Sequence, residues 1–435
     1  MGARYAQGGA AGWHPRSVTA TVNEDVVTQH AELAGFLWTQ RDRAVAAPHY
    51  SLQDLVDLDE RLEANLDGLR IAADVGWELC LAHAEAKGPG AIFAAAVLAI
   101  ESETPIHLER VYALASEAKR LRELIAAFGW IDPQRLHGRV LPLLSADSSV
   151  WRRIGLRVCA IHRVDPKQFL LKAIVDPDPD LRAAALRTIG ELKLQDRAEL
   201  AFAQLGLEDP QCRFWSAWSS VLLGDRGRAL SVLESIASSD SIFKLRAMSM
   251  FLRATGLDAA TAWLRARANS VGSIRAAIDG AGMVGDPLTV PWLIGQMDVP
   301  ERARAAGEAF AFITGADLAY QDLEVRPRGE PEIPEPDTLS PDDDLPLPDP
   351  ALVGRWWADH RSRWRAGVRH LNGKEISTEW LWGVLLHGKQ RARIAAALEL
   401  ALRDDAQPLF EVRARGKVQL VTLGLRPAPP ERATR

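Results

Sequence analysis

The chain has 435 residues, of which 47% are apolar and 25% charged, and its 52 basic and 57 acidic side chains give a net charge of −5. These values are typical of a soluble protein with two or three domains, and the balance argues against a dedicated polyanion binder. The three cysteines are far apart and form no CxxC pair, which excludes a disulfide scaffold or zinc finger and indicates a reducing, cytoplasmic location.

The N-terminal residues 1–25 lack the basic start and continuous apolar core of a secretory signal, so we interpret them as a flexible tail. The most apolar stretch, residues 91–100, is ten residues long. A membrane-spanning helix needs about 20 such residues. We therefore expect no membrane association.

Residues 26–140 have the pattern of a helical module. Ser51 and Asp54 form a capping box, in which each side chain binds a free backbone N–H at the start of a helix. Five leucines then recur at steps of three and four, which places them on one helical face: Leu55, Leu58, Leu62, Leu66 and Leu69. A second helical stretch is predicted over residues 109–128.

Residues 141–320 contain an internal repeat. Four aspartates are spaced 31 residues apart, and an arginine follows each of them: Asp147, Asp178, Asp209 and Asp240, with Arg152, Arg182, Arg213 and Arg246. Two later units keep the arginine, as Arg275 and Arg304. We interpret these residues as a structural ladder, because a stacking contact recurs in every unit, whereas an active site is built once.

About 31 residues accommodate two short helices and two turns. An aspartate before a helix is a favoured N-cap, and the following arginine is placed to reach the aspartate of its own or the adjacent unit. Each helix pair has an apolar face that it cannot bury alone, so the pairs must stack into an α-solenoid. The repeats resemble HEAT repeats in a shortened form.

Residues 321–350 interrupt this pattern with eight prolines, ten acidic and two basic residues, and predict an acidic linker or strap. Residues 351–435 are again helical and carry 16 basic and eight acidic residues, with an extended piece or strand expected at 416–423. The strap's net charge of −8 beside a segment of +8 suggests that the strap folds over and masks the basic segment.

Tryptophan is over-represented, with 14 residues. Aromatic side chains among arginines are typical of interface hot spots and of single-stranded nucleic-acid sites, although a packed terminal cap with a solvated basic face has the same pattern. The candidate binding residues are Trp356, Trp357, Arg361, Trp364, Arg365, Trp380 and Trp382 in the basic segment, and Trp215 and Trp218 in a repeat.

No motif indicates catalysis or metal binding. The ten histidines are scattered without an HExxH pair, there is no GxSxG, and no glycine-rich loop ends in Gly-Lys-Ser/Thr. We expect neither a metal nor a cofactor. The enzyme alternative is a HEAT-like DNA glycosylase using Trp215, Trp218 and Asp209, but the repeats have a net charge of only +1. A continuous positive concave face would favour DNA, and a mixed or apolar one a protein partner.

Three stretches together resemble an uncharacterised family of bacterial HEAT-repeat-like proteins that are often encoded beside type VI secretion components. The first, residues 58–69 (LDERLEANLDGL), has Asn65 where the family pattern has histidine. The second is residues 313–318 (ITGADL), and the third combines residues 388–396 with residues 409–411. The resemblance implies an accessory role near that machinery, as an adaptor, effector chaperone or regulator, and implies no catalytic residue.

The sequence thus predicts an all-α protein: a tail (1–25), a helical module (26–140), about six HEAT-like helix pairs (141–320), a strap (321–350) and a basic helical cap (351–435). The predicted function is non-catalytic binding of a protein partner through the concave face or the cap. DNA binding, or a purely structural brace within a larger assembly, are the alternatives.

Overall fold

The computed structural model describes residues 22–86, 88–102, 104–117, 120–325, 342–404 and 406–424. These residues form an all-α solenoid with a single short β-hairpin between its last helices. Most of the tail predicted at residues 1–25 lies outside the described residues, and the first helix begins at Glu24.

The N-terminal module consists of six helices: α1 (Glu24–Ala44), α2 (Leu52–Ile71), α3 (Ala73–Ala86), α4 (Pro89–Glu101), α5 (Pro105–Glu117) and α6 (Leu121–Trp130). The predicted capping box opens α2, with both of its hydrogen bonds present. All five predicted leucines of α2 are buried. The helical stretch expected over residues 109–128 comprises parts of α5 and α6.

Six helix pairs follow, and in all but the fifth a short helix precedes a longer one: α7 (Val140–Leu144) with α8 (Ser149–Ile161), α9 (Gln168–Ala173) with α10 (Pro179–Glu191), α11 (Ala198–Phe202) with α12 (Pro210–Leu222), α13 (Arg228–Ala237) with α14 (Lys244–Ala254), α15 (Leu257–Ala268) with α16 (Ile274–Val284), and α17 (Val290–Met297) with α18 (Pro300–Thr314). Most of the predicted arginines lie in the long helices, as the spacing predicted. Short 3₁₀ turns separate some of the elements: η1 (Pro133–Leu136), η2 (Gln195–Arg197) and η3 (Pro287–Thr289).

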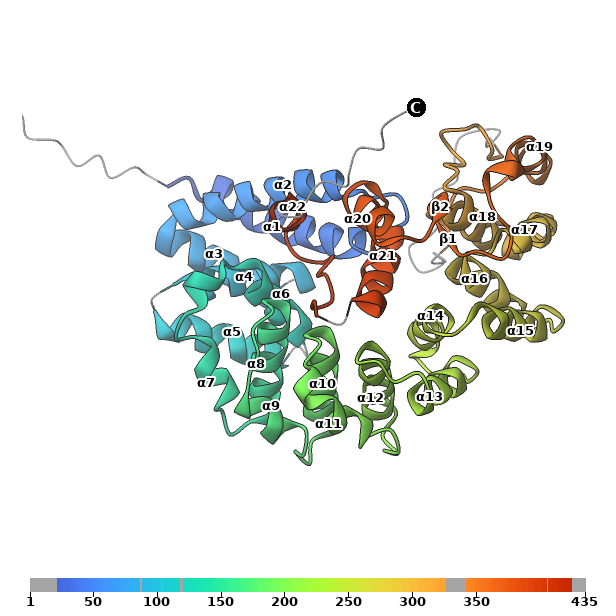
Figure 1. The fold of residues 1–435 in the computed structure, drawn as a ribbon. Helices are drawn as coiled ribbons and strands as arrows, with labels where there is room; N and C mark the ends of the chain where they lie inside the picture. The colour runs from blue at the N-terminus through green and yellow to red at the C-terminus, as the bar shows by residue number, and fades with distance from the viewer. Residues whose placement is uncertain are drawn as a thin grey trace, which may run out of the picture.

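The pairs stack along an arc (Figure 1). The long helices α8, α10, α12 and α14 pack in sequence along its inner side, and the short helices α9, α11 and α13 lie on the outer side. Each unit therefore buries its apolar face against its neighbours, as the repeat pattern predicted. The residues that face the concave side come from the long helices.

The described ends of the predicted strap lie beside α16 and α18. Glu324 and Pro348 form an isolated antiparallel bridge, and Asp342 pairs with Arg275 of α16. Residues 326–341, which carry the centre of the proposed masking segment, lie outside the described residues. Helix α19 (Pro350–His360) then packs on α17 and ends in the 3₁₀ turn η5 (Arg361–Arg363).

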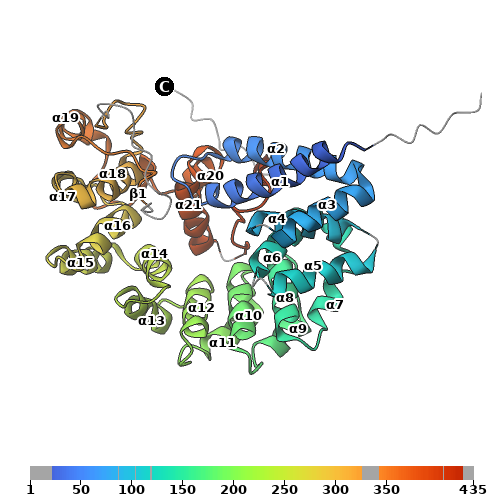
Figure 2. The ribbon, with the colours of Figure 1, turned by 180° about the vertical axis from the view of Figure 1, so that it is seen from behind.

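Beyond η5 the chain returns across the open side of the arc. A hairpin of β1 (His370–Leu371) and β2 (Lys374–Glu375) leads into α20 (Thr378–His387), α21 (Gln390–Arg403) and α22 (Gly416–Gly424). Both views show α20 and α21 between α1–α2 at one end of the arc and α16–α18 at the other (Figures 1 and 2). The segment 351–424 therefore divides into α19, which extends the solenoid, and α20–α22, which bridge its two ends.

The strand expected at residues 416–423 is wrong, because these residues form helix α22. The alternation of apolar and polar residues there does not correspond to two faces of a sheet. Val418 and Val421 are exposed, whereas Gln419 and Leu423, four residues apart, are buried. The helix starts where the Gly416 N–H donates to Asp59 Oδ2 at 2.7 Å.

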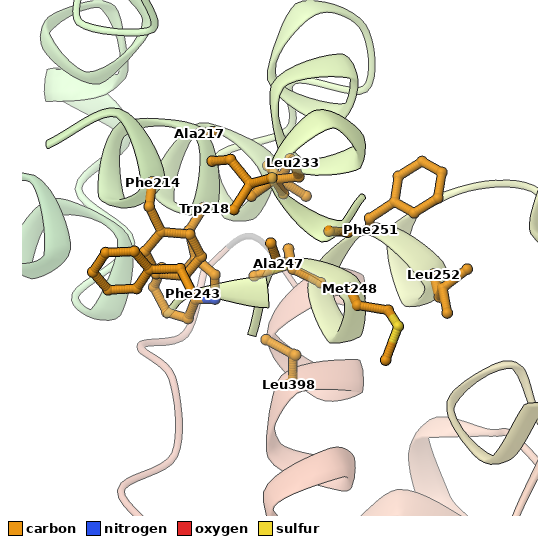
Figure 3. Close-up of a cluster of buried hydrophobic side chains, with 14 of the residues drawn as sticks. Phe214, Ala217, Trp218, Leu233, Phe243, Ala247, Met248, Phe251, Leu252 and Leu398 are labelled. Carbon is orange, nitrogen blue, oxygen red and sulfur yellow. The ribbon is translucent and has the colours of Figure 1, made fainter. Parts of the chain in front are cut away.

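Buried side chains attach the returning segment to the repeats. Leu398 of α21 contributes to the core formed by α12, α13 and α14 and lies beside Ala247 and Met248 of α14 (Figure 3). Arg253 of α14 and Glu399 of α21 form a buried ion pair at 3.1 Å. The C-terminal helices are therefore part of the solenoid's interior packing.

Candidate functional site

The candidate tryptophans of the C-terminal segment occupy two separate places. Trp356 and Trp357 of α19 each pack on Trp364, with ring centroids 5.7 and 5.5 Å apart, and Trp356 also contacts Phe310 of α18. The Trp364 indole N–H donates to the Gly373 carbonyl at 3.1 Å. This cluster fastens α19 and the hairpin to the last repeat.

Trp380 and Trp382 lie on α20, away from that cluster. The Trp380 indole donates to the Leu371 carbonyl at 2.7 Å, and Lys374 lies 4.3 Å from its ring centroid. Trp382 packs edge-on against Phe410. The sequence-adjacent tryptophans of this segment therefore do not converge on one surface.

The two candidate arginines of this segment are exposed. Arg365 pairs with Glu375 of the hairpin at 3.1 Å, and both side chains are largely solvated. Arg361 is exposed in η5. Their exposed position near half-buried Trp357 leaves a basic surface at the end of the solenoid.

Trp215 and Trp218 stack edge-to-face on α12, with centroids 5.4 Å apart. Trp218 is buried in the repeat core, whereas Trp215 also lines a cavity on the concave side. The Asp209 carboxylate accepts the Cys212 N–H at 2.7 Å as the N-cap of α12. The three residues considered for a glycosylase site therefore do not surround one common space.

The aspartates of the ladder differ in their roles. Asp178 caps α10, accepting the N–H groups of Asp180 and Leu181, and its second oxygen accepts from the Ser149 hydroxyl of the preceding repeat. Asp209 caps α12. Asp147 and Asp240 are not N-caps, because α8 begins after Ser148 and α14 after Phe243.

Within the described residues, the arginines of the ladder form no ion pair with the ladder's own aspartates, although Arg152 donates to the Asp147 backbone carbonyl at 2.8 Å. Arg152 pairs with Asp176 at 2.7 Å, and Arg275 pairs with Asp279 and Asp342. Arg182 and Arg304 donate to backbone carbonyls, of Asp176 and Leu345 respectively, while Arg213 is half-buried on α12 and Arg246 lies on the concave side. The 31-residue period therefore marks equivalent helix positions, with partners that change from one repeat to the next.

A cavity of about 640 Å³ lies on the concave side, between the N-terminal module, the inner helices α8–α14 and the segment between α21 and α22. Among the described residues that line it, eight are arginines. The N-terminal module contributes Arg41 and Arg122, the repeats contribute Arg153, Arg157, Arg187 and Arg246, and the returning segment contributes Arg413 and Arg415. We call this cavity the arginine pocket.

Fewer carboxylates than guanidinium groups hold these arginines. Asp42 is shared by Arg122 and Arg413, and Glu191 is shared by Arg157 and Arg187. Three more carboxylates hold one pocket arginine each, in the pairs Arg41–Asp59, Arg153–Asp180 and Arg415–Glu63. Within the described part of the chain, Arg246 has no carboxylate partner. Five carboxylates thus hold seven of the eight guanidinium groups, and a sixth, Glu411, lines the pocket and pairs with Arg163.

The surplus charge is reflected in the pKa values of the arginines. Burial lowers the pKa of Arg246, and the guanidinium groups of Arg187 and Arg413 lower it further, while the carboxylate of Glu191 partly opposes them. Burial likewise lowers the pKa of Arg157, with Arg187 again adding to the shift. Glu191 shows the opposite effect: although burial opposes it, Arg157 and Arg187 bring its pKa to about 2.

Aromatic rings hold several of these guanidinium groups in place. Arg187 lies over the Trp215 ring at 4.6 Å from its centroid, and Arg246 lies over the same ring at 6.0 Å. Arg415 lies 4.7 Å from the Trp130 centroid. Such contacts pre-organise the planar groups without neutralising their charge.

Sequence reasoning identified two residues of this pocket, Trp215 as a candidate binding residue and Arg246 as a rung of the ladder. The other arginines stand far apart in the sequence, from position 41 to position 415, and only the return of the C-terminal segment brings them together. The spacing of Arg153, Arg157 and Arg187 on the inner helices was the one local signal.

A second cavity, of about 330 Å³, lies farther along the concave side between α14, α16, α18 and α21. Its walls carry three arginines and three carboxylates: Arg253, Arg275, Arg391, Asp279, Glu308 and Asp342. Arg391 pairs with Glu308 at 2.6 Å. The concave side is therefore positive in one pocket and balanced in the next.

A family model for HEAT repeats matches residues 168–251, which comprise the repeats from α9 to α14. This match agrees with the HEAT-like stacking of the helix pairs. No curated protein matches the chain. The matched segment includes Arg187, Trp215 and Arg246, so the repeats themselves provide the aromatic centre of the arginine pocket.

Two further properties of the described residues concern membranes and metal ions. No helix in them is both long enough and apolar enough to cross a bilayer. They also contain no group of three or more His, Cys, Asp or Glu side chains arranged to hold a metal ion.

The position at which the resembled family has histidine lies outside the pocket. Asn65 Oδ1 is 3.0 Å from His30 Nδ1, so the pair joins α2 to α1. The side-chain amide of Asn65 also donates to the Arg61 carbonyl. Asn65 therefore holds a packing position between two helices of the N-terminal module.

Proposed function

We propose that this protein is a non-catalytic, HEAT-like adaptor that binds a protein partner, and that an acidic segment of the partner enters the arginine pocket. The observation that carries the proposal is the convergence of eight arginines, from three parts of the chain, on one 640 Å³ cavity, where five carboxylates pair with seven of them. HEAT solenoids offer extended concave surfaces for such contacts.

The pocket favours an anionic ligand of limited size over duplex DNA. A duplex requires a continuous basic surface that neutralises many phosphates, and the balanced second cavity interrupts such a surface here. Helix α21 also occupies the concave side beside α14, with Glu399 paired to Arg253. An acidic peptide segment needs only the pocket itself.

A purely structural brace is less well supported by the same observation. Uncompensated positive charge costs stability in a protein that uses its surfaces only for packing. Arg246, with its lowered pKa and no carboxylate partner among the described residues, is explained by a ligand that supplies the missing negative charge.

An accessory role beside the type VI secretion machinery is the finer part of the proposal. It rests on the three stretches that resemble that family, one of which lies in α2 and one at the end of α18. Residues 409–411 of the third stretch border the arginine pocket, where Glu411 lines the cavity and pairs with Arg163 at 3.6 Å.

The test is binding of a fluorescein-labelled acidic peptide of alternating glutamate and alanine to the full chain, followed by fluorescence anisotropy. We expect binding that weakens with salt and is lost in the double variant Arg187→Gln/Arg246→Gln. The matched control is Arg361→Gln/Arg363→Gln in η5, which should bind like the wild type. Equal binding by both double variants would contradict the proposal.

The secretion context is tested by affinity purification of the full chain from its native cells, in parallel with the Arg187→Gln/Arg246→Gln variant. Secretion components recovered with the wild type and lost with the variant would support the role. The role is contradicted if no secretion component is recovered with the wild type and lost with the variant.

A further inference from the structure

The excess of arginines over carboxylates in the arginine pocket indicates the charge of the ligand that the pocket accepts. Five carboxylates form ion pairs with seven of the eight lining guanidinium groups, and a sixth carboxylate, Glu411, lines the pocket and pairs with Arg163, so the eight arginines still outnumber the carboxylates. A single carboxylate side chain supplies one negative charge. A phosphate monoester supplies about 1.5 to 2 negative charges near neutral pH and three acceptor oxygens.

The number of elements that supply arginines also fits a ligand group with more than two oxygens. Arg122, Arg187, Arg246 and Arg413 come from α6, α10, α14 and the segment before α22, and Arg246 lies close enough to the other three for their charges to affect it. Guanidinium groups supplied by four different elements provide enough donors for the three or more oxygens of a tetrahedral oxyanion, whereas a carboxylate has only two oxygens.

Two of these four groups retain unused donors. In Arg187, Nε binds Glu191 Oε1 at 2.7 Å while its guanidinium plane rests on Trp215. Arg246, also over Trp215, makes no ion pair with any described carboxylate. The Trp215 ring therefore contacts two guanidinium groups without consuming their hydrogen bonds.

We propose that the arginine pocket is a phosphate-binding site, in which Arg187 and Arg246 bind the phosphate above Trp215 and Arg122 and Arg413 close around it. This inference rests on the proposed function, since it specifies the chemistry of the ligand in the same pocket. The phosphate has two possible sources, a phosphorylated side chain of a protein partner or a free nucleotide. The cavity volume of 640 Å³ accommodates either, being within the range of about 300–1,000 Å³ of ligand pockets.

The experiment is isothermal titration calorimetry of the full chain with pyrophosphate and with glutarate, at matched pH and ionic strength. Pyrophosphate provides phosphate oxyanions, and glutarate provides two carboxylates of similar size. We expect pyrophosphate to bind at least tenfold more tightly than glutarate. We further expect the Arg246→Gln variant to have an affinity for pyrophosphate at least tenfold lower than that of the wild type. The control variant Arg363→Gln, in the exposed turn η5, should bind pyrophosphate with the wild-type affinity.

A thermal-shift measurement separates loss of binding from loss of folding. Because Arg246 is repelled by neighbouring arginines, the Arg246→Gln variant without ligand should melt at the wild-type temperature or above it. Pyrophosphate should raise the melting temperature of the wild type and have little effect on the variant. If the Arg246→Gln variant melts well below the wild type, the assignment of Arg246 as a ligand-binding residue that neighbouring arginines repel is contradicted.

Two titrations distinguish the sources of the phosphate. A phosphoserine peptide that binds at least tenfold more tightly than ADP identifies a phosphorylated partner, and the reverse order identifies a nucleotide. If the glutamate peptide of the previous test binds as tightly as the phosphoserine peptide and pyrophosphate, the phosphate inference is overturned while the adaptor proposal stands. If no anionic probe binds, both fail.

Discussion

The ion pair between Arg253 and Glu399 should determine how firmly the C-terminal helices are docked inside the arc. The two side chains are 3% exposed each, and Arg253 Nη1 lies 3.1 Å from Glu399 Oε1. Arg403 also approaches Glu399, at 3.7 Å. Replacing Glu399 with alanine leaves the Arg253 guanidinium buried without a counter-ion, and loss of one partner of a buried pair costs about 3–5 kcal/mol.

Urea denaturation of Glu399→Ala, followed by circular dichroism, should show this loss in the free energy of unfolding. The matched control is Glu375→Ala, which removes the solvated pair with Arg365 and should cost about 0–1 kcal/mol. The double variant Arg253→Met/Glu399→Leu, which replaces both charges with apolar groups, should recover most of the stability. The reasoning is refuted if Glu399→Ala costs no more than Glu375→Ala, or if the double variant is the least stable of all.

Three further predictions concern the repeats, the pocket wall and the N-terminal module. Asp178→Ala should cost about 1 kcal/mol through the lost N-cap of α10, measured by urea denaturation, whereas Asp147→Ala, at a ladder position that caps no helix, should be close to neutral. Because the folded-state pKa of Glu191 is depressed to about 2, its stabilising effect should be full above pH 4.5; the difference in melting temperature between wild type and Glu191→Gln should shrink as the pH falls from 4.5 towards 2. Gly90→Ala should cost about 1–3 kcal/mol, since an added Cβ would lie 1.8 Å from the Gly35 carbonyl oxygen, while Gly88→Ala, with open space around it, should cost less.

Each of these predictions has a result that would contradict it. Equal effects of Asp178→Ala and Asp147→Ala would show that the ladder is not stabilised by helix capping. A melting-temperature difference for Glu191→Gln that grows as the pH falls would reverse the expected sign. A stable Gly90→Ala variant would mean that α1 and α4 do not approach as closely as their backbones indicate.

The repeat architecture could be predicted from the sequence because its information is local. A 31-residue period over four units, an arginine in all six, and apolar residues at steps of three and four are visible in the sequence. These features specify short helices with one apolar face, and such helices bury that face only by stacking. The HEAT-repeat match over residues 168–251 agrees with this reading.

The path of the C-terminal segment could not be predicted in the same way. Its attachment depends on contacts between residues more than a hundred positions apart, such as Arg253 with Glu399 and Asp59 with the Gly416 N–H. No periodic signal encodes such pairs. The prediction of a strand at residues 416–423 in the same segment was wrong. These residues form α22, in which Gln419 is buried, whereas the alternation of a sheet would have buried the apolar residues.

The candidate binding residues stay predictions, and the structure shows which of them lie beside arginines. Tryptophan beside arginine does mark the pocket, but the pair that matters is Trp215 with Arg187 and Arg246 of neighbouring repeats. The dense run of tryptophans after residue 355 instead contributes largely to packing, as in the contact of Trp356 with Phe310. Composition alone does not distinguish aromatic residues that pack from those that support a charged site.

The central claim, that ligands bind in the arginine pocket, is tested most directly by arginine footprinting. The full chain is treated with phenylglyoxal, with and without pyrophosphate, and the modified arginines are identified by mass spectrometry. We predict that pyrophosphate protects Arg187 and Arg246 and leaves Arg361 and Arg363 of η5 as reactive as before. Protection of Arg361 and Arg363, with Arg187 and Arg246 unchanged, would contradict the account and place the binding surface at the end of the solenoid.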